Sequence, residues 1–421
     1  MGVDMRHLLS CAAAAAFLVP SVASADTVCE WMEFSDTIQR AASSPSPNAP
    51  RNPMLDRATT QVSLAMFEAL NAIDHRYESY LHLPQGDAKA SQDAAAVTAA
   101  YKVLLTHYPS QRTALDESYA VAMDEITDPQ AREAGRLIGQ RAAEAALNVG
   151  GIDPAVAQTP YLPRTSPGVW VATGLPVFEP YTIAFRPWIL PNAHAVRPGP
   201  PPALTSERWA KDYDEVKRLG AKDSKVRTPH ETLMARYRIT PLMMPTYRLA
   251  ADVPGRSLVQ NARMFAMLNM IADDTGMATA DAKLHYNFWR PITAIRNADA
   301  DGNAATDPDP AWEPLINTPN HPEYPCAHCS YSAAAGEFMT AEVGAKPPAG
   351  VRVASRSIPN SAIQVLPSWD EWVKQVSYSR TLGGVHYRFS NEAGEGIGRA
   401  VARMAMANIM RPLPAPAKKK R

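Results

Sequence analysis

The hydrophobic positions of this chain recur every three or four residues over most of its length, which is the period of an amphipathic α-helix. One such stripe consists of Leu55, Val62, Met66, Leu70 and Ile73. Similar stripes are found in residues 91–107, 130–148, 256–272, 330–343 and 391–410. Strict alternation of apolar and polar residues, which is typical of β-strands, is scarce. The pattern predicts an all-α fold made of helical bundles.

Prolines gather between the helical segments, so we expect long Pro-rich loops to join the bundles. The chain has 38 prolines, and the stretch 153–204 holds many of them without a sustained period. Aromatic residues in this stretch favour a loop wrapped on the protein over a free linker. They are Trp170, Phe178, Tyr181, Phe185 and Trp188. We predict an N-terminal helical half over residues 26–204, a C-terminal helical domain over residues 205–411 and a basic tail over residues 412–421.

The first 25 residues have the pattern of a signal peptide. Arg6 precedes an apolar run over residues 8–20, and small residues lead up to Ala25. The run is too short to cross a bilayer, and no later segment is apolar over a sufficient length. We therefore predict a periplasmic or secreted protein, cleaved near Ala25.

Composition limits the partners that this chain is expected to bind. Lys and Arg total 42 and Asp and Glu total 42, so no excess positive charge points to nucleic acid. Hydrophobic residues make up 46% of the chain, which is ample for a large core. A homodimer stays open, because long helical bundles with exposed apolar ridges often dimerise.

The candidate chemistry lies in three separated clusters of basic residues. Lys283 and Arg290 form the first, His328 lies in the second, and Arg380 and His386 form the third. Arg forks match tetrahedral oxyanions bidentately, Lys adds a point charge, and imidazole acts as nucleophile, ligand or acid. Together the clusters predict an oxyanion site.

The first cluster lies in a helix-compatible stretch, residues 281–290, which Pro291 should stop or kink. Lys283 and Arg290 are seven residues apart in the sequence, which is two helical turns. We therefore predict that both side chains project from one face of one helix.

The other two clusters contain backbone signals. Pro325 and the small residues after His328 predict a helix start, whose unpaired N–H groups at residues 326–328 suit an anion. Gly383 and Gly384 predict a bend between Arg380 and His386 that brings their side chains onto one ligand.

The order K-x6-RP, then P-Cys-Ala-His, then SR-x5-H resembles the signature shared by type 2 phosphatidic acid phosphatases and vanadium-dependent haloperoxidases. Further stretches resemble the bacterial haloperoxidase branch: residues 284–296, 320–328 and 378–390, with residues 60–74 and 103–109 near the N-terminus. The resemblance covers most of the mature chain and implies a helical-bundle fold.

The resemblance implies two alternative activities at one pocket. As a haloperoxidase, the protein would hold vanadate with His386 as its axial ligand and use peroxide to oxidise a halide, with His328 assisting peroxide. As a phosphatase without a metal, it would form a phosphohistidine at His386 and protonate the leaving group of a phosphate ester from His328. In both, Lys283, Arg290 and Arg380 would bind the oxygens.

One departure from the family pattern concerns the middle block, where the usual Ser-Gly is Cys326-Ala327. Ala327 still supplies a backbone N–H to the oxyanion, whereas Cys326 is a poorer donor than Ser and is open to oxidation by peroxide. The spacing of Cys326 and Cys329 suits a protective disulfide in an exported protein. It also leaves open a non-catalytic oxyanion-binding protein, a thiol-redox centre or a zinc site.

Two further positions bear on the halide. His321 matches a His of the algal bromoperoxidases and is assigned to the halide or substrate pocket. Ala280 stands where the fungal chloroperoxidase carries Trp. The resemblance therefore favours bromide over chloride.

Overall fold

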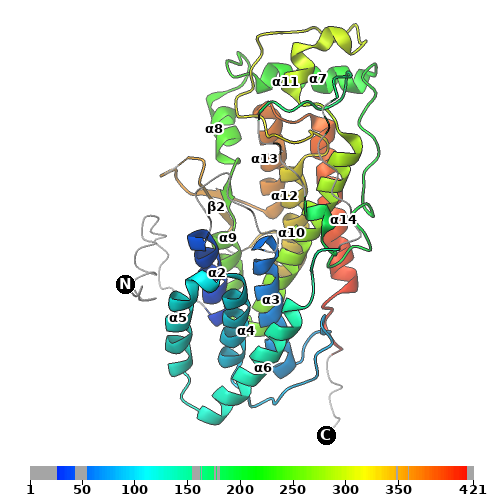
Figure 1. Ribbon diagram of the computed structural model, residues 1–421. Helices are drawn as coiled ribbons and strands as arrows, with labels where there is room; N and C mark the ends of the chain where they lie inside the picture. Colours follow the sequence, from blue (N-terminus) through cyan, green and yellow to red (C-terminus); the bar gives the residue numbers. More distant parts are fainter. Residues whose placement is uncertain are drawn as a thin grey trace. The chain divides into compact units, whose positions relative to one another are not determined.

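The computed structural model describes residues 26–42, 55–153, 162, 164–174, 177, 181–347, 349–358 and 360–414. The predicted signal peptide, Phe178 and most of the basic tail lie outside these residues. The described chain is largely helical, which confirms the all-α prediction (Figure 1). None of its helices combines the length and the apolar run needed to cross a membrane.

The chain forms two compact units, each built from separate stretches of sequence. The first takes the described residues of Met1–Gly151, Tyr247–Met270 and Ala405–Arg421. The second takes those of Ile152–Thr246 and Ile271–Met404. The stretch 152–204, which we grouped with the N-terminal half, therefore lies in the second unit.

The first unit is a bundle of amphipathic helices. It contains α2 (Thr27–Ala42), α3 (Leu55–Ile73), α4 (Gln92–His107), the 3₁₀ turn η1 (Pro109–Gln111), α5 (Arg112–Asp124) and α6 (Pro129–Leu147). Helices α3, α4 and α6 pack against one another. The predicted stripe of α3 is buried at Val62, Met66, Leu70 and Ile73. Local signals set the helix starts, since Ser91 and Asp128 accept hydrogen bonds from the first turns of α4 and α6.

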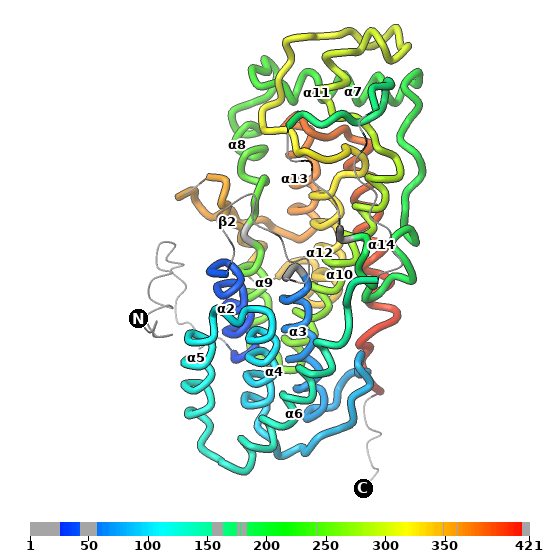
Figure 2. The backbone as a smooth tube through the Cα atoms, viewed as in Figure 1, coloured from blue at the N-terminus to red at the C-terminus, as the bar shows by residue number. Residues whose placement is uncertain are grey.

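The second unit holds all three predicted clusters. Its helices are α7 (Glu207–Gly220), α8 (Pro229–Tyr237), α11 (Pro291–Arg296), α12 (Ala327–Val343) and α13 (Trp369–Leu382), with the 3₁₀ turns η2 (Tyr181–Ala184) and η3 (Ala298–Ala300). Helices α9 (Met244–Ala251), α10 (Leu258–Tyr286) and α14 (Arg388–Asn408) contribute residues to both units. Helices α12 and α13 lie side by side (Figures 1 and 2).

A small antiparallel sheet in the second unit was not predicted. Its strands are β1 (Pro241–Leu242), β2 (Val351–Ser355) and β3 (Gln364–Leu366), in the order β1-β2-β3. Pro241 pairs with Ser355, and Val351 pairs with Leu366. Strands of two to five residues are too short for alternation to stand out in the sequence.

The Pro-rich stretch 153–204 is irregular where it is described, apart from η2. Buried Trp170, Phe185 and Trp188 pack it into the second unit, as expected of a wrapped loop. The Asp274 carboxylate holds this loop in place, because it accepts hydrogen bonds from the N–H groups of residues 188–190 at 2.7–2.9 Å.

The prediction that Lys283 and Arg290 share one helix is wrong. Helix α10 ends at Tyr286, and Asn287 takes a positive φ of 44°. Arg290 is the extended N-cap of a new helix, α11, which starts at Pro291. Proline suits the first position of a helix, where no N–H is needed, and it disfavours helical geometry in the residue before it.

An aromatic cluster fixes the segments that carry the basic residues. Trp209 of α7 packs on Trp289, with ring centroids 5.9 Å apart, and on Tyr387, at 5.1 Å. Both partners are buried, and they are the direct sequence neighbours of Arg290 and His386. Buried aromatic pairs add about 0.5–1.5 kcal/mol beyond their area, so this cluster holds both backbones firmly.

Two glycines let α14 approach the first turns of α12 closely. A Cβ at Gly394 would collide with the backbone oxygen of Cys326, and a Cβ at Gly398 would collide with that of Ser330. Gly396, on the same helix, faces open space. The close approach places the start of α12 directly against the helix that follows His386.

We expect Gly398→Ala to destabilise the protein by about 1–3 kcal/mol, because the added methyl overpacks a backbone contact. The matched control, Gly396→Ala, should stabilise it by about 0.5–1 kcal/mol through better helix propensity. The free energy of unfolding in denaturant measures both effects. Equal shifts for the two variants would contradict the packing described here.

Candidate oxyanion site

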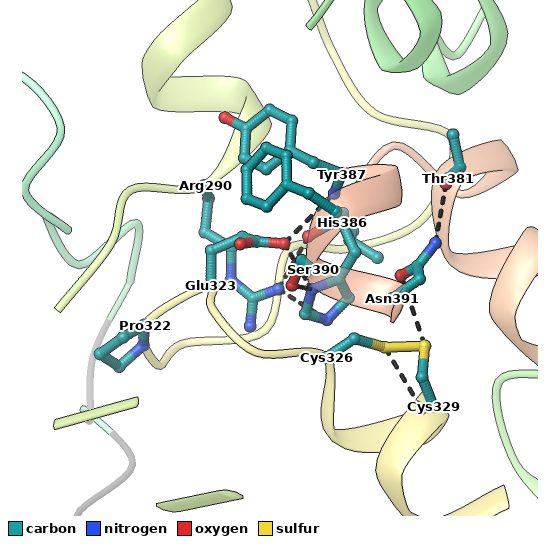
Figure 3. A network of polar contacts seen from close by, with 12 residues as sticks. Arg290, Pro322, Glu323, Cys326, Cys329, Thr381, His386, Tyr387, Ser390 and Asn391 are labelled. Atoms are coloured by element: carbon teal, nitrogen blue, oxygen red, sulfur yellow. Dashed lines mark hydrogen bonds and ion pairs between the residues drawn. A yellow bond between two sulfur atoms is a disulfide. The ribbon is translucent and has the colours of Figure 1, made fainter. Parts of the chain in front are cut away.

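The predicted basic residues come from separate elements of the second unit, and their charges act on one another. Figure 3 shows two of them, Arg290 and His386, side by side. Lys283 lies in the last turn of α10, Arg290 precedes α11, Arg380 lies in the last turn of α13 and His386 precedes α14. Their exposed fractions are 6%, 0%, 2% and 1%. We call these four residues, with Ala327 and His328 at the start of α12, the oxyanion site.

His386 is held by a buried carboxylate, that of Glu323. Nδ1 of His386 lies 2.7 Å from Oε1 of Glu323, which also accepts from the Tyr387 N–H at 3.2 Å (Figure 3). The pairing places the imidazole proton on Nδ1 and leaves Nε2 unprotonated, which suits a base, a nucleophile or a ligand.

Arg290 completes the environment of His386. Its Nη1 lies 3.1 Å from Nε2 of His386 and donates to the Val385 carbonyl at 2.8 Å. Its Nε donates to the His321 carbonyl at 3.0 Å. The guanidinium therefore lies next to Nε2 of His386. From there it can bind an oxygen of an anion that approaches this nitrogen.

Lys283 is anchored by the loop before α12. Its Nζ donates to the carbonyl oxygens of Pro322 and Glu323, both at 2.8 Å. Two neutral acceptors leave the third ammonium proton for another partner. Although its helix ends earlier than predicted, Lys283 therefore still reaches the oxyanion site.

Arg380 is the clearest indication of an anion. Its Nε and Nη1 are buried and have no hydrogen-bond partner among the described residues. The charge that acts on it is that of Arg290, which repels it. A buried guanidinium without an acceptor is costly, so this position is suited to an oxyanion.

Gly383 and Gly384 form the predicted bend between Arg380 and His386. Gly384 has a positive φ of 77°, and a Cβ there would collide with the backbone of Gly220. The tight turn ends α13 and returns the chain to the site at His386.

Helix α12 starts where predicted, with Cys326 as its N-cap. The N–H groups of Ala327 and His328 have no acceptor within the helix and suit an anion. The prediction is wrong for the Cys326 N–H, which donates to the Ser390 carbonyl at 3.1 Å. The side chain of Cys326 is also lost as a donor, because it forms a disulfide with Cys329. Cys29 is a free, buried thiol in the first unit.

His328 and His321 are neutral imidazoles near the cations. Nε2 of His328 lies 3.0 Å from the Ile239 carbonyl, so it carries the proton and Nδ1 is unprotonated. The charge of Arg380, followed by burial, lowers the pKa of His328 to about 3. Burial, followed by the charge of Arg290, holds the pKa of His321 well below its usual value. His285, by contrast, is exposed and lies against Arg197.

The site carries excess positive charge, and both burial and repulsion among the cations oppose that charge. Burial lowers the pKa of Arg290 to about 10 and that of Arg380 to about 9, so both stay charged at neutral pH. Burial also lowers the pKa values of Lys283 and His386. It raises the pKa of Glu323 to about 7, although Arg290 and Lys283 oppose that shift. A bound anion would relieve the repulsion among the cations.

A cavity of about 390 Å³ borders the site. Its wall has residues from three segments. They are Ala280, Lys283 and Leu284 of α10, His321 and Pro322 of the loop before α12, and Ala327 and Tyr331 of α12. Leu284 and Tyr331 are exposed, whereas Lys283 is buried. The cavity is large enough for a small organic molecule beside the oxyanion site.

Glu323 is the functional residue that sequence reasoning missed. It lies in the stretch His321-Pro322-Glu323-Tyr324-Pro325, in which His321 and Pro325 carried predictions and the carboxylate carried none. Its one signal was a carboxylate between apolar residues and prolines, close to a predicted helix start. A buried carboxylate needs a cationic or N–H partner, and that requirement points to the basic clusters.

Comparisons with known proteins support the predicted superfamily. A model of the VCPO second helical-bundle domain matches residues 263–414, the range that contains all of the oxyanion site. Vanadium chloroperoxidase of Curvularia inaequalis is 29% identical over 107 residues, which cover 22% of this chain and 17% of that protein.

Solved structures share the fold over nearly the whole chain. A bacterial vanadium-dependent iodoperoxidase has a TM-score of 0.74 at 21% identity and covers 96% of this chain and 100% of its own. A bacterial vanadium-dependent chloroperoxidase in its apo form has a TM-score of 0.63 at 18% identity, covering 88% of this chain and 96% of its own.

Residues 263–414 thus resemble the second helical-bundle domain of VCPO, and the chain shares its fold with vanadium-dependent haloperoxidases. The site differs from the signature of the predicted superfamily at Cys326-Ala327, where the structure has a disulfide and a backbone donor.

We expect sulfate to bind more tightly as the pH falls from 7 to 5. Arg380 is the largest cause of the low pKa of His328, and a bound anion offsets its charge. The pKa of His328 then rises, so binding takes up a proton and is favoured at lower pH. Titration calorimetry at several pH values measures the slope. His328→Gln, which keeps a side-chain donor, should make the slope shallower, and an unchanged slope would exclude His328 as the proton acceptor.

Proposed function

We propose that this protein is an exported enzyme of the vanadium-dependent haloperoxidase type, which uses hydrogen peroxide to oxidise a halide, bromide in preference to chloride. The observation that carries the proposal is the pair of Glu323 and His386, which leaves Nε2 unprotonated beside Arg290 and close to the unsatisfied Arg380. An unprotonated nitrogen that faces a cluster of cations would suit a ligand to a metal oxyanion whose oxygens the cations bind.

The residues present fit vanadate. The unpartnered Nε and Nη1 of Arg380 and the third proton of Lys283 offer donors to an oxyanion. Nη2 of Arg290, which contacts the His321 ring with one proton, has a second proton to offer. Ala327 adds its backbone N–H, and Nε2 of His386 would be the ligand to vanadium. When bound, vanadate supplies a Lewis-acidic centre that activates peroxide for halide oxidation.

The chain's own residues hold charge and protons around that group. Glu323 keeps the proton of His386 on Nδ1 and so keeps Nε2 available. His328 accepts a proton at Nδ1 once an anion lowers the repulsion from Arg380. Lys283, Arg290 and Arg380 bind negative oxygens without reorganising, because carbonyls and packing already fix them.

The cavity beside the site supports the halide and substrate assignment of His321. His321 and Ala280 both line it. Ala280 leaves open the space that a Trp would fill, and His321 is a neutral imidazole against Arg290. We infer that bromide, which is oxidised more easily than chloride, is the better substrate.

A phosphatase without a metal is the second candidate. The same neutral Nε2, backed by a carboxylate, suits nucleophilic attack on phosphorus, and Arg380 suits the phosphoryl oxygens. The disulfide argues against a third reading, the thiol-redox module. Both sulfur-bearing residues are 0% exposed, so a partner protein's thiol has no direct access to them. The disulfide also favours an oxidising compartment, which supports the proposed export.

The first test is bromide oxidation by mature protein loaded with orthovanadate in phosphate-free buffer. We expect peroxide-dependent bromination of a dye, lost in His386→Ala and Arg290→Ala while helical content by circular dichroism is unchanged. Aryl phosphate hydrolysis that requires His386, without bromination by folded protein, would establish the phosphatase instead.

A second test separates coordination from simple anion binding. Glu323→Gln removes the negative charge but keeps an oxygen for the Nδ1 proton. We expect vanadate binding to weaken about 10–100-fold, because the ligand nitrogen becomes less basic. Phosphate, which gains from the loss of a nearby negative charge, should bind no more weakly than to the unmodified protein. Calorimetry with both anions checks this, and equal weakening of the two would argue against His386 as a metal ligand.

A further inference from the structure

The Cys326–Cys329 disulfide encloses the part of the site that comes from α12. The two Cα atoms are 5.4 Å apart, and the residues between them are Ala327 and His328. The residues that supply the backbone donor and the imidazole of this turn are therefore both part of the covalent ring that the disulfide closes. Any change in the bridge acts first on these two residues.

The same bridge is joined to the segment that follows His386. The Cys326 N–H donates to the Ser390 carbonyl at 3.1 Å, and Sγ of Cys329 lies 3.3 Å from Oδ1 of Asn391 (Figure 3). Oγ of Ser390 lies 3.5 Å from Nδ1 of His386. The bridge therefore contacts the turn that carries His328 and the segment that packs against His386.

Little room exists for the turn to relax. Cys326 and Cys329 are both 0% exposed. Gly394 of α14 approaches so closely that a Cβ there would collide with the Cys326 carbonyl, and it would lie 3.2 Å from Cβ of Cys329. Two unbonded sulfur atoms must separate to van der Waals contact, so opening the bridge has to displace this turn.

We propose that the Cys326–Cys329 disulfide positions the first turn of α12 for oxyanion binding and is closed by hydrogen peroxide, so that a thiol reductant weakens oxyanion binding. The positioning role is independent of the reaction proposed above. Only the supply of peroxide as the natural oxidant rests on the proposed function.

The closing reaction balances with peroxide as the sole oxidant. A Cys326 thiolate, at a helix N-terminus among cations, attacks one peroxide oxygen; the O–O bond breaks and hydroxide leaves. The Cys329 thiol then attacks the resulting sulfenic acid, the S–S bond forms and water leaves. Two thiols and one H₂O₂ give one disulfide and two waters. The cavity that reaches Ala327 gives small molecules a route to this turn.

The test uses phosphate as the probe, because its binding requires neither vanadate nor halide oxidation. Native protein is treated with dithiothreitol and desalted without oxygen, and free thiols and the phosphate Kd are measured. We expect two additional thiols and at least a tenfold rise in Kd. One equivalent of H₂O₂ should remove the two thiols and restore the Kd.

Each outcome bears on the proposal. An unchanged Kd after the bridge opens would overturn the positioning role. A bridge that resists dithiothreitol in the folded protein would overturn redox control. Loss of bromide oxidation alone, with these responses intact, would count against the proposed function and not against the bridge.

Two variants sharpen the result. Cys329→Ala cannot form the bridge, so its phosphate Kd should be raised before any peroxide is added. Peroxide should then add oxygen to the unpartnered Cys326, seen by mass spectrometry. Cys29→Ala, which removes the buried thiol of the first unit, should behave as the unmodified protein does. Equal peroxide resistance of the two variants would contradict the proposal.

Discussion

The second unit is organised around the burial of three cations in one place. Lys283, Arg290 and Arg380 are almost inaccessible to solvent, and burying an unpaired ion costs several kcal/mol. Glu323 is the carboxylate that acts on Lys283 and Arg290, and it is shared with His386. Backbone carbonyls supply the other acceptors, so the cations are held while the site keeps excess positive charge. That excess suits the site to an anion.

The packing around the site follows from this requirement. The rings beside Arg290 and His386 in the sequence, Trp289 and Tyr387, are fixed on Trp209. Because the aromatic cluster holds the backbone, the polar side chains need not be held by ion pairs that would neutralise them. In each of these short segments the aromatic residue therefore contributes to stability, and the polar residue next to it faces the site.

The departure from the family signature changes how α12 contributes. A serine hydroxyl would donate to the oxyanion, whereas the side chain of Cys326 has no proton to donate because it is bonded to Cys329. The remaining contribution is the backbone N–H of Ala327 and the imidazole of His328. Their orientation depends on the bridge and on the close approach of α14 at Gly394. A covalent constraint has therefore replaced a side-chain hydrogen-bond donor at the start of α12.

The sequence by itself determined the helices and the members of the basic clusters. The stripe that predicted residues 91–107 became α4, Gln92–His107, because burial of one helix face leaves a local period. The sequence did not determine that α10 ends at Tyr286. Helix propensity permits a helix up to Pro291, and only packing selects the earlier end. The pairing of Glu323 with His386 joins residues 63 positions apart, and no periodic pattern encodes it. Tertiary structure alone decided which nitrogen of His386 is unprotonated, because that depends on where a buried carboxylate finds its partner.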